Sequence, residues 1–178
     1  MLQLKEFSAS GRESWETSRK LEQNIRELMS EEQDIRIDYE ISFAMFLRDF
    51  AYRAYRADEP VVADRLLEES ISELTEVASE HPGNKKTLLE LAMSYFHYWE
   101  RHDGELPDAS ARTWLERSKK ALNLEGCPDL DVASRQSLIE HNREEARSHA
   151  IRLMEKGYQE PEFKRYCLEY GLCSATGQ

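Results

Sequence analysis

The chain has 178 residues, of which 40% are hydrophobic and 10% aromatic, so it can bury a substantial core and is too apolar for a disordered tail. Its 35 acidic residues outnumber its 24 Lys and Arg residues, and the formal net charge of -11 disfavours binding to nucleic acid or to anionic lipid. Only seven Gly and five Pro interrupt the chain. This scarcity of helix breakers predicts an all-α fold.

Targeting signals and cysteine usage bear on location. The first residues lack the apolar core of a signal peptide, and no run of 18 apolar residues occurs, so direct membrane insertion is not predicted. Cys127, Cys167 and Cys173 are odd in number and form no C-x-x-C motif. Neither a disulfide framework nor a zinc site is indicated, and a reducing, cytoplasmic setting is expected. Cys167 is assigned to core packing rather than to redox chemistry.

Hydrophobic periodicity predicts three helices in the first half of the chain. The first covers about residues 14–30 and serves as an N-terminal cap. The second covers about 34–57 and ends before Pro60, because the residue that precedes a proline avoids the α region. The third covers about 60–80 and begins with that proline, whose missing N–H costs nothing in a first turn.

Four further helices are predicted in the second half. Helices over about 85–102 and 108–124 are separated by a loop that contains Gly104. A long helix is predicted over about 131–156, and a short one over about 161–170. No linker divides the seven elements, so a single domain over 1–178 is expected.

The chain also repeats itself at an offset of 48 residues. Residues 63–70 and 111–118 share four identities in eight positions, and residues 43–47 match 91–95 at the same offset. Recurrence of two separate segments at one offset indicates that a helical hairpin is used twice.

The repeated residues resemble the tetratricopeptide (TPR) motif, which reads W-x2-L-G-x2-Y, then A-x3-F, then P. The second unit contains Leu88-x2-Leu91-Ala92-x2-Tyr95, then Ala111-x3-Leu115, then Pro128. The first unit contains Glu40-x2-Phe43-Ala44-x2-Leu47, then Ala63-x3-Leu67, then Pro82. Small residues at Ala44, Ala63, Ala92 and Ala111 allow the helices of a hairpin to approach closely.

The period departs from that of the family. A TPR unit has about 34 residues, so an offset of 48 implies helices that are longer than the family norm. The resemblance implies antiparallel hairpins stacked as a short, right-handed TPR-like solenoid. Within the single domain we expect a capping helix in 1–33, repeat 1 in 34–82, repeat 2 in 83–130 and a divergent C-terminal hairpin in 131–178.

Few residues suggest chemistry. His141, Glu145 and His149 recur at four-residue steps on the predicted 131–156 helix, but the HExxH spacing is absent and His149 falls at the edge of an apolar stripe. A half-buried histidine is therefore favoured over a metal ligand, and no metal or cofactor is predicted. The chain contains no GxxxxGK[ST], GxGxxG or GxSxG string. We predict that it is not an enzyme.

The remaining candidates are surface aromatic residues. The resemblance implies that the first helix of each hairpin lines the concave binding side, where Tyr52, Tyr55, Tyr98 and His102 are the candidate partner-binding residues. His97 is assigned to the surface or rim. The expected function is a non-enzymatic scaffold or adaptor module that binds a protein or peptide. The net charge of -11 favours a basic partner, and homodimer formation is left open. The alternative is a regulatory or sensory domain of a larger signalling, transcriptional or transport protein.

Overall fold

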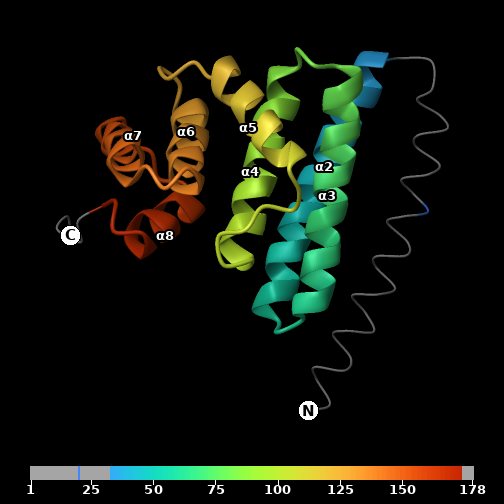
Figure 1. The fold of residues 1–178 in the computed structure, drawn as a ribbon, viewed down its shortest axis with the longest axis horizontal. Coiled ribbons are helices and arrows are strands. Elements are labelled where there is room, and N and C mark those ends of the chain that lie inside the picture. Colours follow the sequence, from blue (N-terminus) through green and yellow to red (C-terminus); the bar gives the residue numbers. More distant parts are fainter. Residues whose placement is uncertain (1–19, 21–32, 174–178) are drawn as a thin grey trace. The chain divides into compact units, whose positions relative to one another are not determined.

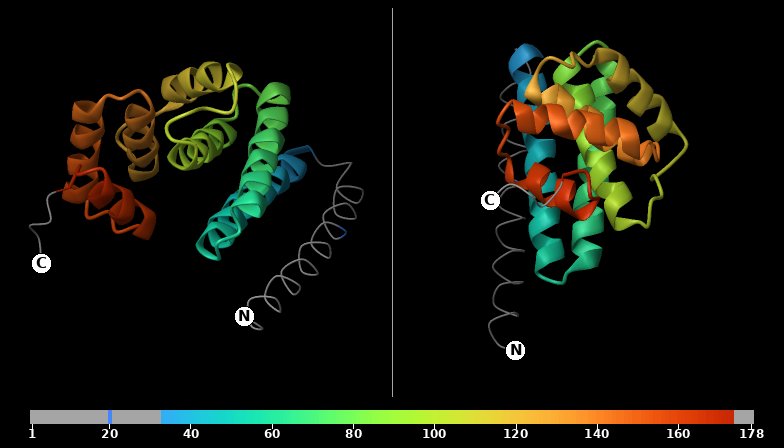
Figure 2. Two further views of the ribbon diagram at one scale, coloured as in Figure 1. Left: turned by 60° about the horizontal axis from the view of Figure 1, so that its bottom comes forward. Right: turned by 90° about the vertical axis from the view of Figure 1, so that its left-hand side faces the viewer.

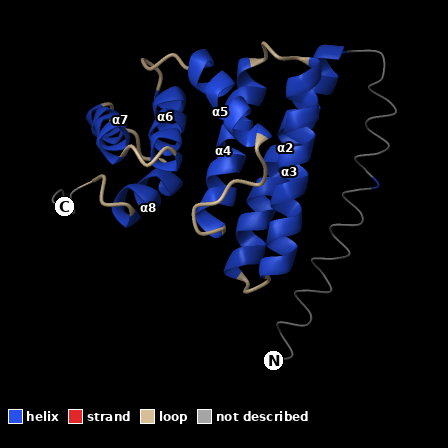
Figure 3. Ribbon diagram, in the orientation of Figure 1, coloured by secondary structure: helices blue, strands red, loops and turns tan. Residues whose placement is uncertain are grey.

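The computed structural model describes residues 20 and 33–173, which form seven α-helices and no strand (Figures 1 and 3). The chain divides into two compact units, residues 1–40 and 41–178. In the described part of the first unit, Arg36 Nε donates to Glu40 Oε1 at 2.9 Å. The helix predicted over 14–30 lies outside the described residues, apart from Lys20.

Most predicted helix boundaries agree with the structure to within three residues. The helices are α2 (Gln33–Arg56), α3 (Pro60–Glu80), α4 (Lys85–Arg101), α5 (Ser110–Ala121), α6 (Cys127–Ile139), α7 (Arg143–Glu155) and α8 (Pro161–Glu169). Local chemistry accounts for several of these ends. Proline occupies the first turn of α3 and of α8, and the Asn84 side chain caps α4 by accepting from Thr87 N at 3.1 Å.

Consecutive helices of the second unit pack mainly as sequential pairs (Figure 2). Helix α4 is the central element, because it contacts α3, α5 and α6. The Ser70 hydroxyl donates to the Ala44 carbonyl at 2.8 Å and lies 3.2 Å from Ser94 Oγ, which ties α3 to α2 and to α4. The alanines predicted to allow close approach, Ala44, Ala63, Ala92 and Ala111, are each 2% exposed or less.

The single helix predicted over 131–156 is wrong. Helix α6 ends at Ile139 and α7 begins at Arg143, with His141 between them at a φ of 57°. His141 N donates to Leu138 O at 2.9 Å and Asn142 N donates to Ser137 O at 2.7 Å, the hydrogen bonds of a Schellman turn. Residues 127–169 thus form three helices where two were predicted.

The Asn142 side chain caps the start of α7 directly after this turn. Asn142 Oδ1 accepts from Glu145 N at 3.2 Å, and Asn142 Nδ2 donates to Glu145 Oε2 at 2.9 Å. The Asn142 side chain therefore satisfies one of the amides that a helix start leaves unpaired. Its role is to begin α7, at a position that the predicted 131–156 helix would place in a helix interior.

Candidate functional site

Tyr52 and Tyr55 lie in the last turns of α2. Tyr55 is 55% exposed and Tyr52 is half-buried. The guanidinium carbon of Arg101, on α4, lies 4.5 Å from the centre of the Tyr55 ring, and that of Arg56 lies 6.0 Å from the Tyr52 ring. Cations at these positions stabilise an aromatic face, so Tyr55 has a defined position despite its exposure.

Tyr98 and His102 form a second aromatic pair, near the end of α4. Their rings are stacked, with centroids 3.9 Å apart and planes inclined by 18°, and both residues are half-buried. The neighbouring helix α3 provides acidic groups. His102 Nε2 lies 3.5 Å from Asp64 Oδ1, while burial and the charges of Glu68 and Asp64 raise the pKa of Tyr98. This pair therefore lies beside a negatively charged stretch of α3.

One ion pair connects the two aromatic groups. Arg101 donates to Asp64 Oδ1 from Nε at 3.1 Å and from Nη2 at 2.5 Å. Arg101 contacts the Tyr55 ring, and Asp64 faces His102. The Arg101–Asp64 pair thus brings together side chains from α2, α3 and α4, and Tyr55 and His102 contact it from two sides.

A small pocket of about 110 Å³ adjoins Tyr52 and Tyr55. It is bounded by α2, α3, α4 and α8, and Tyr98 and His102 are not part of its wall. Its lining combines aromatic and ionic side chains: Arg48, Tyr52, Tyr55, His97, Glu100, Arg101, Arg165 and Glu169, together with Ala51 and Leu67. The pocket therefore combines charged groups with a largely apolar wall, and its volume is comparable to that of a small chemical group.

A second, wider groove of about 800 Å³ runs along α5 and the loop before it. Both signs of charge line this groove, because Arg112 and Lys119 face it together with Glu116 and Glu140. Lys119 Nζ lies 2.7 Å from Glu140 Oε2 within it. Glu105 and Asp108 also line the groove, so its carboxylates outnumber its Lys and Arg side chains and it carries an excess of negative charge.

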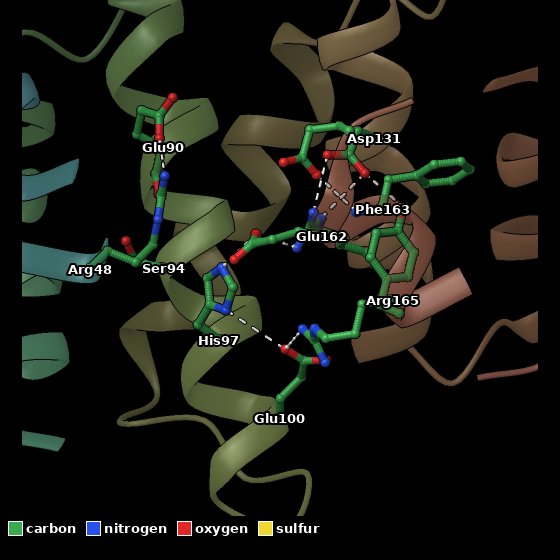
Figure 4. Close-up of polar contacts among 12 residues, drawn as sticks. Arg48, Glu90, Ser94, His97, Glu100, Asp131, Glu162, Phe163 and Arg165 are labelled. Atoms are coloured by element: carbon green, nitrogen blue, oxygen red, sulfur yellow. Dashed lines mark hydrogen bonds and ion pairs between the residues drawn. The ribbon is translucent and has the colours of Figure 1, made fainter. Parts of the chain in front are cut away.

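An ionic network next to the small pocket joins α4 to α8 (Figure 4). Arg165 Nη2 donates to Glu100 Oε2 at 2.9 Å. His97 lies between two carboxylates, with Nδ1 at 3.6 Å from Glu100 and Nε2 at 3.4 Å from Glu162. The assignment of His97 to the surface is wrong, since it is only 8% exposed. The burial of His97 depends on contacts with α8, for example with Glu162. Because α8 is distant in the sequence, the residues around His97 do not reveal this burial.

Arg135 is the most deeply buried cation of this region, with 1% of its side chain exposed. It donates to Asp131 from Nε at 3.3 Å and from Nη2 at 3.2 Å, and Asp131 also accepts from the Tyr166 hydroxyl at 2.7 Å. The guanidinium carbon lies 4.4 Å from the Tyr166 ring and 5.1 Å from the Phe96 ring. A carboxylate and two aromatic faces thus compensate this buried charge.

Burial and pairing shift the acid–base properties of this network. Burial lowers the pKa of His97, although the Glu162 carboxylate opposes this effect. Burial alone would raise the pKa of Glu162, but its contacts with His97 and Arg135 lower that pKa to about 2. Burial also raises the pKa of Tyr166, as does the negative charge of Asp131. These groups interact with one another across α4, α6 and α8, an arrangement suited to holding the helices together.

The residues considered for metal binding do not lie on one helix. His141 is in the turn between α6 and α7, whereas Glu145 and His149 are on α7. His149 is 8% exposed, and its Nε2 lies 3.9 Å from Glu145 Oε1. Within the described ranges, no group of three or more His, Cys, Asp or Glu residues has an arrangement suitable for a metal ion.

The cysteines differ from the expectation. Cys167 and Cys173 form a disulfide across the C-terminal end of α8, while Cys127 at the start of α6 is free. Cys167 is fully buried, so the prediction that it packs in the core is confirmed. The prediction that no disulfide is indicated is wrong for this pair, because a turn after α8 brings Cys173 back to Cys167.

No protein-family model, no curated protein and no solved structure matches the chain. The described residues define an all-helical domain in which seven helices pack mainly as sequential pairs.

Proposed function

We propose that this chain is a non-enzymatic interaction module, a scaffold or adaptor that binds a segment of a partner protein on the surface formed by Tyr52, Tyr55, Tyr98 and His102. One observation carries the proposal. These four aromatic side chains are partly exposed: Tyr55 and His102 contact the Arg101–Asp64 ion pair, Tyr98 stacks on His102, and Tyr52 lies 6.0 Å from the Arg56 guanidinium carbon. Side chains that are both ordered and accessible bind partners at low entropic cost, and aromatic residues dominate such surfaces.

The TPR-like architecture is part of the proposal. Positions related by the offset of 48 are buried alike: Ala44 and Ala92, Ala63 and Ala111, and Ser70 and Ser118 are each 2% exposed or less. Equal burial at equivalent positions supports a hairpin that is used twice. In such an array α2 and α4 are first helices, and these are the helices that carry the four aromatic residues.

The partner is proposed to be a basic protein segment. The net charge of -11 favours cationic partners at long range, and Asp64 and Glu68 place negative charge beside Tyr98. The same field disfavours nucleic acid. In the described part of the chain, no helix has the length and apolar character needed to span a bilayer. We further propose a cytoplasmic location, and a homodimer remains compatible with this surface.

The test compares the wild type with a Tyr55→Ala/Tyr98→Ala variant. Both proteins capture partners from cell extract, and affinities for an identified, purified partner are then measured by calorimetry. The double variant is expected to weaken binding at least about tenfold, because it truncates both aromatic groups. Ile151→Ala is the matched control, since Ile151 is 41% exposed on α7 and lies outside the proposed surface.

Circular dichroism establishes that all three proteins are folded. Equal affinity of the wild type and the double variant would exclude this surface as the binding site. If the partner sets were also identical and persisted at high salt, the regulatory or sensory domain would become the better explanation, because screening removes long-range steering of a basic partner.

A further inference from the structure

The C-terminal end of α8 brings two cysteines of unequal exposure together. Cys167 is fully buried, whereas Cys173, six residues later, is half-buried. Their Cα atoms are 5.3 Å apart, within the range that a disulfide requires, and the two residues are bonded. Cys127 is on α6 and has no part in this pair.

Backbone hydrogen bonds hold the two cysteines together independently of the sulfur atoms. Leu172 N donates to Cys167 O at 2.8 Å, and Cys173 N donates to the same oxygen at 3.1 Å. Gly171 makes the turn possible with a φ of 61°, a conformation that L residues rarely adopt. Two thiols held in this way have a high effective concentration, so the bond can form again after it is broken.

This turn also determines where Tyr170 lies. The Tyr170 ring is 5.9 Å from Trp99 and 6.4 Å from Phe96, both on α4. Arg143 Nη2 donates to the Tyr170 carbonyl at 2.9 Å from the start of α7. Glu169, the preceding residue, lines the small pocket. The bond between the cysteines therefore restrains a segment that contacts α4, α7 and the pocket.

We propose that Cys167 and Cys173 form a reversible disulfide, a redox modification site that controls the order of the α8 terminus. The reductant is a low-molecular-weight thiol of the glutathione class. In the oxidised form the covalent bond restrains residues 167–173. In the reduced form only the backbone hydrogen bonds and the contacts of Tyr170 remain, and this segment opens more often.

The exchange starts at Cys173, because its partner is fully buried. A thiolate attacks Cys173 Sγ, the sulfur–sulfur bond breaks, and Cys167 leaves as a thiolate that takes up a proton. A second thiolate attacks the sulfur of the small molecule in the mixed disulfide and releases the thiolate of Cys173. In total, two small thiols are oxidised to one small disulfide while the protein disulfide is reduced to two thiols.

The experiment equilibrates the full chain in glutathione buffers that range from fully oxidised to fully reduced. Thiols are trapped with N-ethylmaleimide in denaturant and counted by mass spectrometry. We expect one label, on Cys127, in oxidising buffer and three labels in reducing buffer. Hydrogen exchange of the amides of residues 170–173 is expected to be at least about tenfold faster in the reduced form, since these amides lose a covalent restraint.

Two variants separate this role from general destabilisation. Cys173→Ser leaves the buried Cys167 in place and should exchange like the reduced wild type in both buffers. Cys127→Ser should retain the full redox response. Three labels at every glutathione ratio, one label even with excess dithiothreitol in the absence of denaturant, or equal exchange rates in the two forms would each overturn the proposal. The reduced wild type provides the comparison if Cys173→Ser does not fold.

Discussion

At the scale of single residues, buried charge is the feature that most distinguishes this molecule. Arg135 is among the largest fully buried side chains, and its partners Asp131 and Tyr166 are also buried. Such a group is retained only when its hydrogen bonds and charge are compensated, because transfer of an unpaired ion into the interior costs several kcal/mol. We therefore expect removal of Arg135 to destabilise the protein mainly because it leaves the buried Asp131 carboxylate without its cation.

We predict that Arg135→Gln lowers the free energy of unfolding by about 3–5 kcal/mol, because it leaves the Asp131 carboxylate buried without a cation. Denaturant unfolding measures the change. Lys119→Gln is the matched control, since its 2.7 Å ion pair with Glu140 is largely exposed and should contribute less than about 1 kcal/mol. Equal losses for the two variants would show that Asp131 is solvated rather than buried.

At the scale of elements, the break between α6 and α7 determines how the C-terminal third folds. A residue other than glycine, His141, occupies the left-handed position of the turn, so the usual sequence signal for a helix end is missing. The start signal is present, however. The spacing of an N-cap asparagine, Asn142, with a glutamate three residues later, Glu145, can be read from the sequence and would have divided the predicted 131–156 helix correctly.

Asn142→Ala is predicted to lower the free energy of unfolding by about 0.5–2 kcal/mol, because the amide of Glu145 loses its acceptor. Asn142→Asp retains a side-chain oxygen and should remain close to the wild type. Thermal or denaturant unfolding of both variants provides the measurement. If the alanine and aspartate variants were equally stable, the cap would contribute nothing to the stability of α7.

At the scale of the second unit, the network around His97 couples distant helices. The charged groups that face His97 come from each neighbouring element: Glu100 on its own helix, Glu162 on α8, Arg135 on α6 and Arg48 on α2. Burial lowers the pKa of His97 in the folded state. The unfolded chain therefore binds a proton on this residue at a higher pH than the folded protein does.

This difference predicts that the stability due to His97 is fully present above the unfolded pKa of about 6.5 and is lost as the pH falls below it. His97→Gln should show a weaker decrease in the free energy of unfolding between about pH 7 and pH 5. Denaturant titrations at a series of pH values compare the two proteins. The pKa of His149 is also lowered, so the comparison with the variant isolates the part due to His97. Identical pH profiles would contradict the prediction.

Glu162 affects the free energy of unfolding over a lower pH range than His97 does. Its pKa is lowered from 4.5 to about 2, so its contribution is present above pH 4.5 and is lost as the pH falls from there towards 2. The responses of His97 and Glu162 are therefore separable in a single titration.

The sequence by itself determined most helix bounds and the burial of the repeated alanines, although hydrophobic periodicity missed the break between α6 and α7. The bounds of α3 at Pro60 and Glu80 and the burial of Ala44, Ala63, Ala92 and Ala111 follow from local rules, namely proline placement and the 3.6-residue period. Cys167 and Cys173 are only six residues apart, and the turn at Gly171 after α8 brings them together. Tertiary structure alone decided the ionic network beside the small pocket. His97 and Arg135 acquired their surroundings when α8 packed against α4 and α6, and contacts between residues so distant in the chain leave no local pattern that a single sequence could reveal.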